Sequence, residues 1–197
     1  VGKTVGLMLA ASVWANPEVG RYIHTFNSTS VGREKSAAFV NSLPLILDEL
    51  QIIKDKKDFD QSIYMLSEGA GRTRGNKSGG VDKTPTWSNC VITSGEMPIT
   101  NASSGGGAVN RILEVECTER LFDDPRHVAN TLKSNYGFAG KAFVELLQVP
   151  EMIEAAQIIY EQIYAQTKTE DTMEKQAGAA ALVLTADKLV TDWIFKD

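Results

Sequence analysis

Apolar and polar positions follow two different patterns along this chain. Over the first two-thirds, short apolar runs of strand length alternate with longer stretches of helical period. The short runs predict strands at residues 22–26, 43–47, 89–93 and 111–117. The longer stretches predict helices at residues 4–15, 33–42 and 58–67. After Arg120 the period is helical only, with breaks near Gly137, Pro150 and Lys168.

This order of elements predicts an α/β fold with a helical addition. Strands that alternate with helices imply a parallel sheet covered on both faces, which is a three-layer sandwich. We expect the core at residues 1–120 and a helical lid or bundle at residues 121–197. In the last helix, the apolar period predicts a buried face made of Leu182, Leu184, Leu189, Val190, Trp193, Ile194 and Phe195.

The composition limits the partners and the surroundings that we expect for this chain. The 197 residues include 20 basic and 25 acidic side chains, a net charge of −5, so any nucleic-acid contact must be a local patch. No apolar run is long enough to span a membrane, and we expect a cytoplasmic protein. Cys90 and Cys117 lie in apolar runs without metal-type spacing, which favours reduced cysteines in the core.

The chain begins with Val1-Gly2-Lys3-Thr4, the second half of the phosphate-binding pattern G-x-x-x-x-G-K-[ST]. The first glycine and the strand that precedes it are not in the sequence. Gly2 would let the backbone approach phosphates, Lys3 would reach the β- and γ-phosphates of ATP, and the Thr4 hydroxyl would bind Mg²⁺.

An acidic pair follows a buried-type strand. Asp48 and Glu49 come directly after the apolar residues 43–47, where a carboxylate is costly unless it is paired or bound to metal. Asp48 would hold Mg²⁺ through water, and Glu49 would polarise the attacking water. The alternative is that both acids cap the next helix, where the helix dipole favours them.

The predicted strand at residues 22–26 separates the phosphate loop from the acidic pair. This arrangement resembles the additional-strand catalytic-glutamate division of P-loop ATPases. The resemblance implies a P-loop sandwich with the strand order five-one-four-three-two, whose central first strand would be the one absent here. In this division the end of the strand at residues 89–93 is sensor 1, a role that Thr93 or Ser94 fits and for which we favour Thr93; an ordinary strand-to-turn transition is the alternative.

Arginines are the next candidates. In ring ATPases of this division an arginine before the fifth strand acts as a finger on a neighbouring subunit's γ-phosphate, and Arg111 occupies that place. The alternative is a surface arginine paired with a glutamate. If Arg111 is the finger, catalysis needs a homo-oligomeric ring.

The glycine-rich segment at residues 69–86 is predicted to be a long exposed loop or ribbon. Its basic residues are Arg72, Arg74, Lys77 and Lys83. Superfamily-three ring helicases place a DNA-gripping hairpin here, so these side chains would contact phosphates. Two alternatives stay open: Arg72 or Arg74 acts on ATP in trans, or the loop is only solvated. Trp87 beside it could stack on a base, although a core anchor is favoured.

Taken together, the chain resembles a helicase-like domain of unknown function from phage, plasmid and integrated-element proteins of bacteria, often labelled "superfamily two helicase and inactivated derivatives". The matching stretches are GKTVGLMLAASVWANP, LPLILDELQ, IYMLSEGAGRTRG, TWSNCVITSGEMPIT, NRILEVE and LTADKLVTDWIF. The resemblance implies replication of a mobile element, beside a primase module.

These observations lead to one expectation and one rival. We expect an ATP-hydrolysing, Mg²⁺-dependent motor that acts on DNA. The rival is a non-catalytic nucleotide-binding or scaffold module of a replication complex. Intact Lys3, Thr4, Asp48 and Glu49 favour the enzyme.

Overall fold

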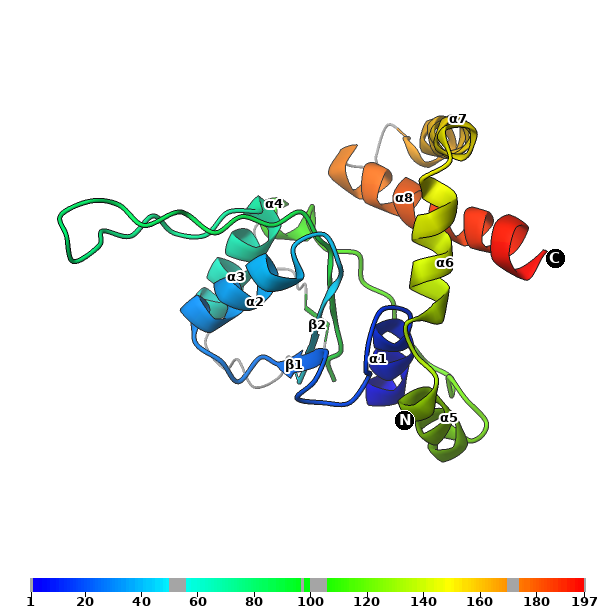
Figure 1. Ribbon diagram of the computed structural model, residues 1–197, viewed down its shortest axis with the longest axis horizontal. Helices are drawn as coiled ribbons and strands as arrows, with labels where there is room; N and C mark the ends of the chain where they lie inside the picture. The colour runs from blue at the N-terminus through cyan, green and yellow to red at the C-terminus, as the bar shows by residue number, and fades with distance from the viewer. Residues whose placement is uncertain (1, 50–55, 97, 100–105, 170–173, 197) are drawn as a thin grey trace.

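The computed structural model describes residues 2–49, 56–96, 98–99, 106–169 and 174–196. A sheet of three strands lies beside an all-helical region (Figure 1). The strands are β1 (Ile23–Thr25), β2 (Leu45–Asp48) and β3 (Val91–Thr93). The helices are α1 (Lys3–Ser12), α2 (Ser30–Val40), α3 (Lys56–Glu68), α4 (Gly106–Val109), α5 (Pro125–Ser134), α6 (Phe138–Leu147), α7 (Pro150–Thr167) and α8 (Glu174–Val190), followed by the π-helical turn η2 (Thr191–Phe195).

The sheet is parallel and has the order β1-β2-β3. The expected order five-one-four-three-two contains the same neighbours, with β1, β2 and β3 as its second, third and fourth strands. The middle strand β2 pairs Ile46 with Ile23 on one side and with Ile92 on the other. All four residues of β2 are buried, as is usual for a parallel strand covered on both faces.

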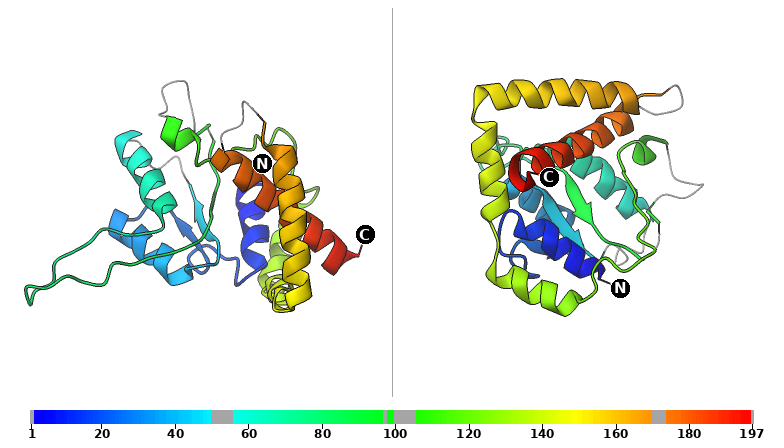
Figure 2. Two further views of the ribbon diagram at one scale, coloured as in Figure 1. Left: turned by 90° about the horizontal axis from the view of Figure 1, so that it is seen from above. Right: turned by 90° about the vertical axis from the view of Figure 1, so that its right-hand side faces the viewer.

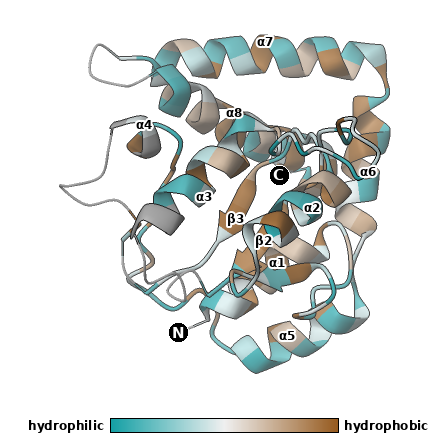
Figure 3. Cartoon of the chain, turned by 90° about the vertical axis from the view of Figure 1, so that its left-hand side faces the viewer, coloured by the Kyte–Doolittle hydropathy of each residue, from teal (hydrophilic) through white to brown (hydrophobic). Residues whose placement is uncertain are grey.

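Helices cover both faces of the sheet (Figure 2). Side chains alternate across β2, so Leu45 and Leu47 face α2 and α3, while Ile46 faces α1. The first face also buries Phe26, Ala37, Val40, Leu66 and Trp87. The second buries Leu7, Met8, Ala11 and Ile23, with α5 packed beside them through Ala129 and Leu132. In Figure 3 the apolar strands β2 and β3 lie between these helices.

The segment between α3 and β3 is a two-armed ribbon that projects from the sheet region (Figure 1). Antiparallel bridges join Ala70 to Thr86 and Gly75 to Val81. At the tip, the Asn76 side chain accepts hydrogen bonds from the backbone amides of Ser78 and Gly80. The expected exposed ribbon at residues 69–86 is confirmed. Trp87 is a core anchor, because it is buried and its indole N–H donates to the Leu66 carbonyl at 2.8 Å.

One predicted strand does not form. Residues 112–117 have no regular secondary structure, and Arg111 lies in a turn. No strand that the structure describes pairs with this segment. A strand needs a hydrogen-bonded neighbour for its N–H and C=O groups, and apolar composition alone cannot supply one. The polar loop expected at residues 97–108 lies largely outside the described residues.

The helical region breaks where the sequence predicts. Gly137 adopts a left-handed conformation (φ 81°) before α6, Pro150 begins α7, and Lys168 ends it. α6 joins the sheet region through Gly140, whose N–H donates to the Val13 carbonyl at 3.0 Å. A β-carbon on Gly140 would lie only 2.6 Å from an atom of the Trp14 ring, so this junction requires glycine.

Two predictions about burial are wrong, one of them only in part. Leu189 is buried as predicted, but it shares the buried face of α8 with Ala177, Ala181 and Thr185, whereas Leu182, Leu184 and Phe195 are exposed. Small residues line this face because α8 packs closely against α7. Cys90 and Cys117 are unpaired and exposed rather than in the core. Among the described residues, no helix is both long enough and apolar enough to cross a membrane.

Candidate active site

The Asp48 carboxylate is the centre of a hydrogen-bonded cluster. Thr4 Oγ1 donates to one carboxylate oxygen at 3.0 Å, and Ser94 Oγ donates to the other at 2.6 Å. The backbone N–H of Glu49 also donates to this second oxygen at 2.9 Å. Asp48 is only 7% exposed, so these three donors satisfy a carboxylate that would otherwise be costly to bury.

The parallel sheet explains why residues so far apart in sequence meet here. Asp48 is the last residue of β2, and Ser94 directly follows the last residue of β3. Both therefore emerge at the carboxyl edge of the sheet, where ligands of open α/β sheets bind. Thr4 lies in the first turn of α1, which packs on β2. This cluster unites the two motifs that the sequence places 44 residues apart.

Gly2 and Lys3 form the beginning of α1. Gly2 has φ 107° and ψ 3°, a left-handed conformation that glycine adopts without strain. The Lys3 ammonium donates to the Gly95 carbonyl at 3.2 Å and lies 3.9 Å from a Glu96 carboxylate oxygen. Lys3 therefore extends towards the loop after β3, on the same side as Ser94. Val1, the first residue of the predicted motif, lies outside the described residues.

Glu49 has an exposed side chain and an unusual backbone. Its φ is 63°, a left-handed value that few residues other than glycine adopt. Such conformations are held by their surroundings and concentrate at functional sites. Here the conformation accompanies the hydrogen bond from its N–H to Asp48. The Glu49 carboxylate is thus a solvent-accessible acid directly beside a buried one.

The two hydroxyl residues at the end of β3 differ. Thr93 pairs with Leu47 inside the sheet, and its buried hydroxyl oxygen has no hydrogen-bond partner in the part of the chain that the structure describes. Ser94 is the residue that reaches Asp48. The sequence admits both residues for sensor 1 and favours Thr93; of the two, Ser94 is the one that contacts the Asp48 carboxylate.

Arg111 is held within its own chain. Its guanidinium donates to the Gly107 carbonyl and lies 5.0 Å from the centre of the Tyr64 ring on α3. Gln176 of α8 donates to the carbonyls of Val109 and Ile112, on either side of Arg111, at 3.0 and 3.5 Å. The described contacts of Arg111 are therefore with α4 and α3, and its neighbours in sequence contact α8; none of these contacts reaches the Asp48 cluster.

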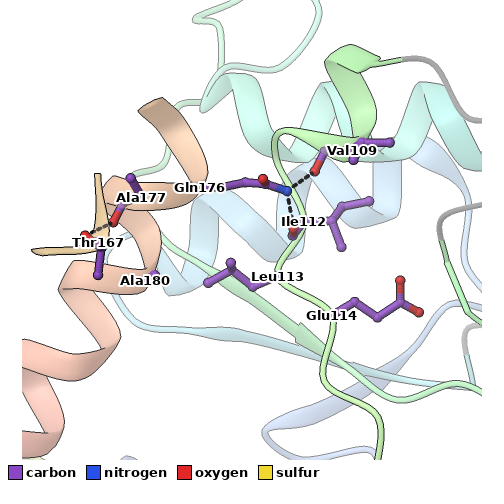
Figure 4. Close-up of a pocket in the computed structure, with 8 residues that line it drawn as sticks. All are labelled: Val109, Ile112, Leu113, Glu114, Thr167, Gln176, Ala177 and Ala180. Carbon is purple, nitrogen blue, oxygen red and sulfur yellow. Dashed lines mark hydrogen bonds between the residues drawn. The ribbon is translucent and has the colours of Figure 1, made fainter. Parts of the chain in front are cut away.

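Beside this turn lies a cavity of about 460 Å³ (Figure 4). Its lining comes from the last residue of α4 and the segment that follows, from the end of α7 and from the beginning of α8. The lining residues are Val109, Ile112, Leu113, Glu114, Thr167, Gln176, Ala177 and Ala180. None of them belongs to the Asp48 cluster, so the cavity and the cluster are separate features.

The four basic residues of the ribbon fall into two groups. Arg72, Lys77 and Lys83 are exposed. Arg74 instead forms an ion pair with Glu34 of α2, with 2.7 Å between nitrogen and oxygen. Sequence reasoning missed Glu34, although the helical period places it one turn before the apolar Ala37 and therefore on the buried face of α2.

Three parallel strands with helices on both faces define an α/β fold, and the Asp48 cluster lies at the carboxyl edge of the sheet, where open α/β sheets bind their ligands. A family model described as a domain of unknown function (DUF927) matches residues 1–87, from the α1 motif to Trp87. No curated protein matches the sequence.

Among solved structures, the fold is similar to that of "SCCmec type IV Cch - active helicase", with a TM-score of 0.72 and 20% sequence identity. The similarity covers 96% of this chain and 36% of that one, so this chain spans about a third of the length of its structural relative. The likeness extends across both the sheet and the helical region.

Proposed function

We propose that this chain carries the nucleotide site of an ATP-hydrolysing motor that acts on DNA in the replication of mobile elements. The single observation behind the proposal is the hydrogen bond between Thr4 and Asp48, which joins the phosphate-loop hydroxyl to the carboxylate of the acidic pair. The fold likeness to an active helicase supports the same class of protein.

The residues of the cluster fit Mg²⁺ and a nucleotide phosphate chemically. Thr4 and Asp48 offer hydroxyl and carboxylate oxygens, which are the protein ligands that Mg²⁺ prefers. The amino end of α1, with Gly2 and Lys3, offers backbone N–H groups and a positive charge to phosphate oxygens. Bound Mg²⁺ would neutralise charge on the β- and γ-phosphate oxygens.

Each remaining residue of the cluster then has a role. Glu49 accepts a proton from the attacking water, because its carboxylate is exposed beside the buried Asp48. Lys3 leaves the Gly95 carbonyl and binds the phosphates. Ser94, or Thr93 as the sequence favours, orients the water against the γ-phosphate.

The finger role requires a second subunit. Arg111 would serve a neighbouring copy in a homo-oligomeric ring, which requires that its guanidinium leave Tyr64 on assembly. Arg72, which is exposed, is the alternative finger. The ribbon contacts DNA through Arg72, Lys77 and Lys83, and a primase module in the cytoplasm is the expected partner.

The deciding experiment replaces Glu49 with Gln in the full-length protein. We expect ATP hydrolysis to fall by about 10²-fold or more, because the proton acceptor is lost, while ATP binding is retained. Glu161→Gln, an exposed acid in the middle of α7, is the matched control and should leave hydrolysis unchanged. Undiminished hydrolysis in Glu49→Gln would contradict the assignment.

The rival function, a non-catalytic scaffold, predicts a different result for the unmodified protein. A motor hydrolyses ATP faster when single-stranded DNA is added, whereas a scaffold shows no such stimulation. Measuring steady-state ATP hydrolysis with and without an oligonucleotide therefore separates the two.

A further inference from the structure

A buried carboxylate lies beneath the base of the ribbon. Glu34 of α2 has a side chain that is 1% exposed, and the Arg74 guanidinium reaches it from the ribbon. The Arg74 side chain itself is 35% exposed, so the ion pair joins a buried carboxylate to a partly exposed guanidinium. Arg74 is one of the four basic residues that the sequence alone assigns to nucleic-acid or trans contacts.

The position of Glu34 follows from α2. Thr29 caps this helix by accepting a hydrogen bond from the Gly32 amide at 3.1 Å, and the buried face then contains Glu34, Ala37 and Val40. A carboxylate on such a face is costly unless an opposite charge compensates it. Arg74 supplies that charge, which ties the ribbon to α2.

Close packing fixes the same end of the ribbon. A β-carbon on Gly71 would lie 2.7 Å from Cγ of Pro85 and 2.9 Å from a Glu34 carboxylate oxygen, so the two arms and α2 meet without spare room. The Gly71 amide donates across the arms to the Pro85 carbonyl at 2.8 Å. Trp87 completes the attachment by its bond to Leu66 at the end of α3.

The outer half of the ribbon has no comparable anchor among its described contacts. Its turn is closed locally by Asn76, and the exposed Lys77 and Lys83 stand near it. The ribbon is therefore an arm with a fixed base and a free charged end. A fixed base presents these charges in one direction, which lowers the entropy lost when they bind.

We propose that Arg74 is a positioning residue, and that its ion pair with Glu34 locks the ribbon onto α2 so that Arg72, Lys77 and Lys83 are presented to nucleic acid. The presentation to nucleic acid rests on the proposed function; the lock itself does not. The four ribbon cations thus divide into one structural residue and three contact residues.

The affinity of Glu34→Gln for single-stranded DNA separates two roles of Arg74, a lock on the ribbon and a direct contact with DNA, because the two roles predict opposite changes in that affinity. Glu34→Gln removes a carboxylate that competes for Arg74, so a contacting Arg74 would bind single-stranded DNA at least as tightly. With the lock, Glu34→Gln and Arg74→Gln each weaken binding several-fold, and the double variant is no weaker than either single one. Tighter binding by Glu34→Gln would overturn the proposal.

The salt dependence supplies a matched control. Lys77→Gln removes a phosphate contact and should lower the slope of log affinity against log salt by about one. Arg74→Gln should leave that slope unchanged, because Arg74 neutralises Glu34 rather than a phosphate. A slope lowered equally by both substitutions would overturn the lock.

Hydrogen exchange tests the lock without nucleic acid. The amides of Gly71, Asp82 and Trp87 donate across the ribbon arms. They should exchange several-fold faster in Glu34→Gln and Arg74→Gln and at the normal rate in Lys77→Gln. The double Gln variant leaves neither member of the pair as an uncompensated charge and should stay folded if either single variant does not. Unchanged exchange in the variants would overturn the lock, whereas faster exchange in a protein that binds no DNA would support the lock and contradict the proposed function.

Discussion

The sheet region and the helical region bury different kinds of side chain. In the sheet region the largest fully buried side chains include Ile23, Leu45, Ile46 and Leu47. In the helical region the buried face of α8 has three small residues and Leu189. Large apolar side chains contribute more transfer free energy on burial than alanine does. Each buried side chain of the sheet therefore contributes more to stability than the alanines of α8 do, and the sheet region is the one that holds the Asp48 cluster.

The helical region and the carboxyl edge of the sheet also differ in the side chains that they expose. α8 and η2 expose large apolar side chains, namely Leu182, Val183, Leu184 and Phe195. By contrast, the carboxyl edge of the sheet presents hydroxyls, carboxylates and Lys3. The buried β2 gives Asp48 and its hydrogen-bond donors a rigid support.

The largest expected effect tests this contrast directly. Ile46→Ala should lower the free energy of unfolding by about 2–5 kcal/mol, because it leaves a cavity in a fully buried position. Leu182→Ala, on the exposed side of α8, should change it by less than about 0.5 kcal/mol. Urea denaturation followed by circular dichroism measures both, and equal effects would contradict the comparison.

The close packing of α7 and α8 makes a second prediction. Ala181 is completely buried, so Ala181→Leu should destabilise the protein by about 1–3 kcal/mol through overpacking. Ala186→Leu places the same side chain on the exposed face of α8 and should be neutral. Thermal unfolding of the two variants checks the prediction; a tolerated Ala181→Leu would mean that the interface has room to spare.

The end of β3 offers a smaller test within the site itself. Ser94→Ala removes one of three hydrogen bonds to a buried carboxylate and should cost about 1.5 kcal/mol. Thr93→Val replaces a buried hydroxyl that lacks a described partner and should leave the unfolding free energy unchanged or raise it slightly. Chemical denaturation in the absence of nucleotide measures both. A larger loss of unfolding free energy in Thr93→Val than in Ser94→Ala would show that the Thr93 hydroxyl, and not that of Ser94, stabilises the site.

The smallest expected effect depends on pH. Tyr22 packs on both faces of the sheet core and donates its hydroxyl to the Pro44 carbonyl at 2.9 Å. Burial, with a smaller contribution from Cys90, raises the pKa of Tyr22 from 10.0 to about 12. The fold therefore favours the neutral phenol, and this stabilisation is complete below pH 10 and is lost as the pH rises towards 12.

Tyr22→Phe is the control for that titration. It should flatten the fall in unfolding free energy that the ionisation of Tyr22 causes in the unmodified protein between pH 10 and pH 12. Urea denaturation at several pH values measures the difference. An identical pH dependence in both proteins would show that Tyr22 does not carry the effect.

The sequence predicted the sheet more accurately than the segments around it. The composition of runs such as Leu45–Asp48 predicts a buried parallel strand, and Gly137 and Pro150 mark where α6 and α7 begin through backbone constraints that act locally. The segment after Arg111 has a similar apolar composition, yet it forms no strand, since pairing depends on a neighbour. The buried face of α8 was missed because alanines give little hydrophobic signal.

Local patterns in the chain were thus sufficient to indicate the α/β class, the ribbon and the residue types of the Asp48 cluster. Three assignments depended on the tertiary structure: Ser94 as the hydroxyl that reaches Asp48, Tyr64 as the support of Arg111, and Glu34 as the partner of Arg74. The physical reason is the same for each. A motif specifies the chemistry of a side chain through local sequence, whereas its partner comes from another element, and only the packing of those elements brings the two within hydrogen-bond distance.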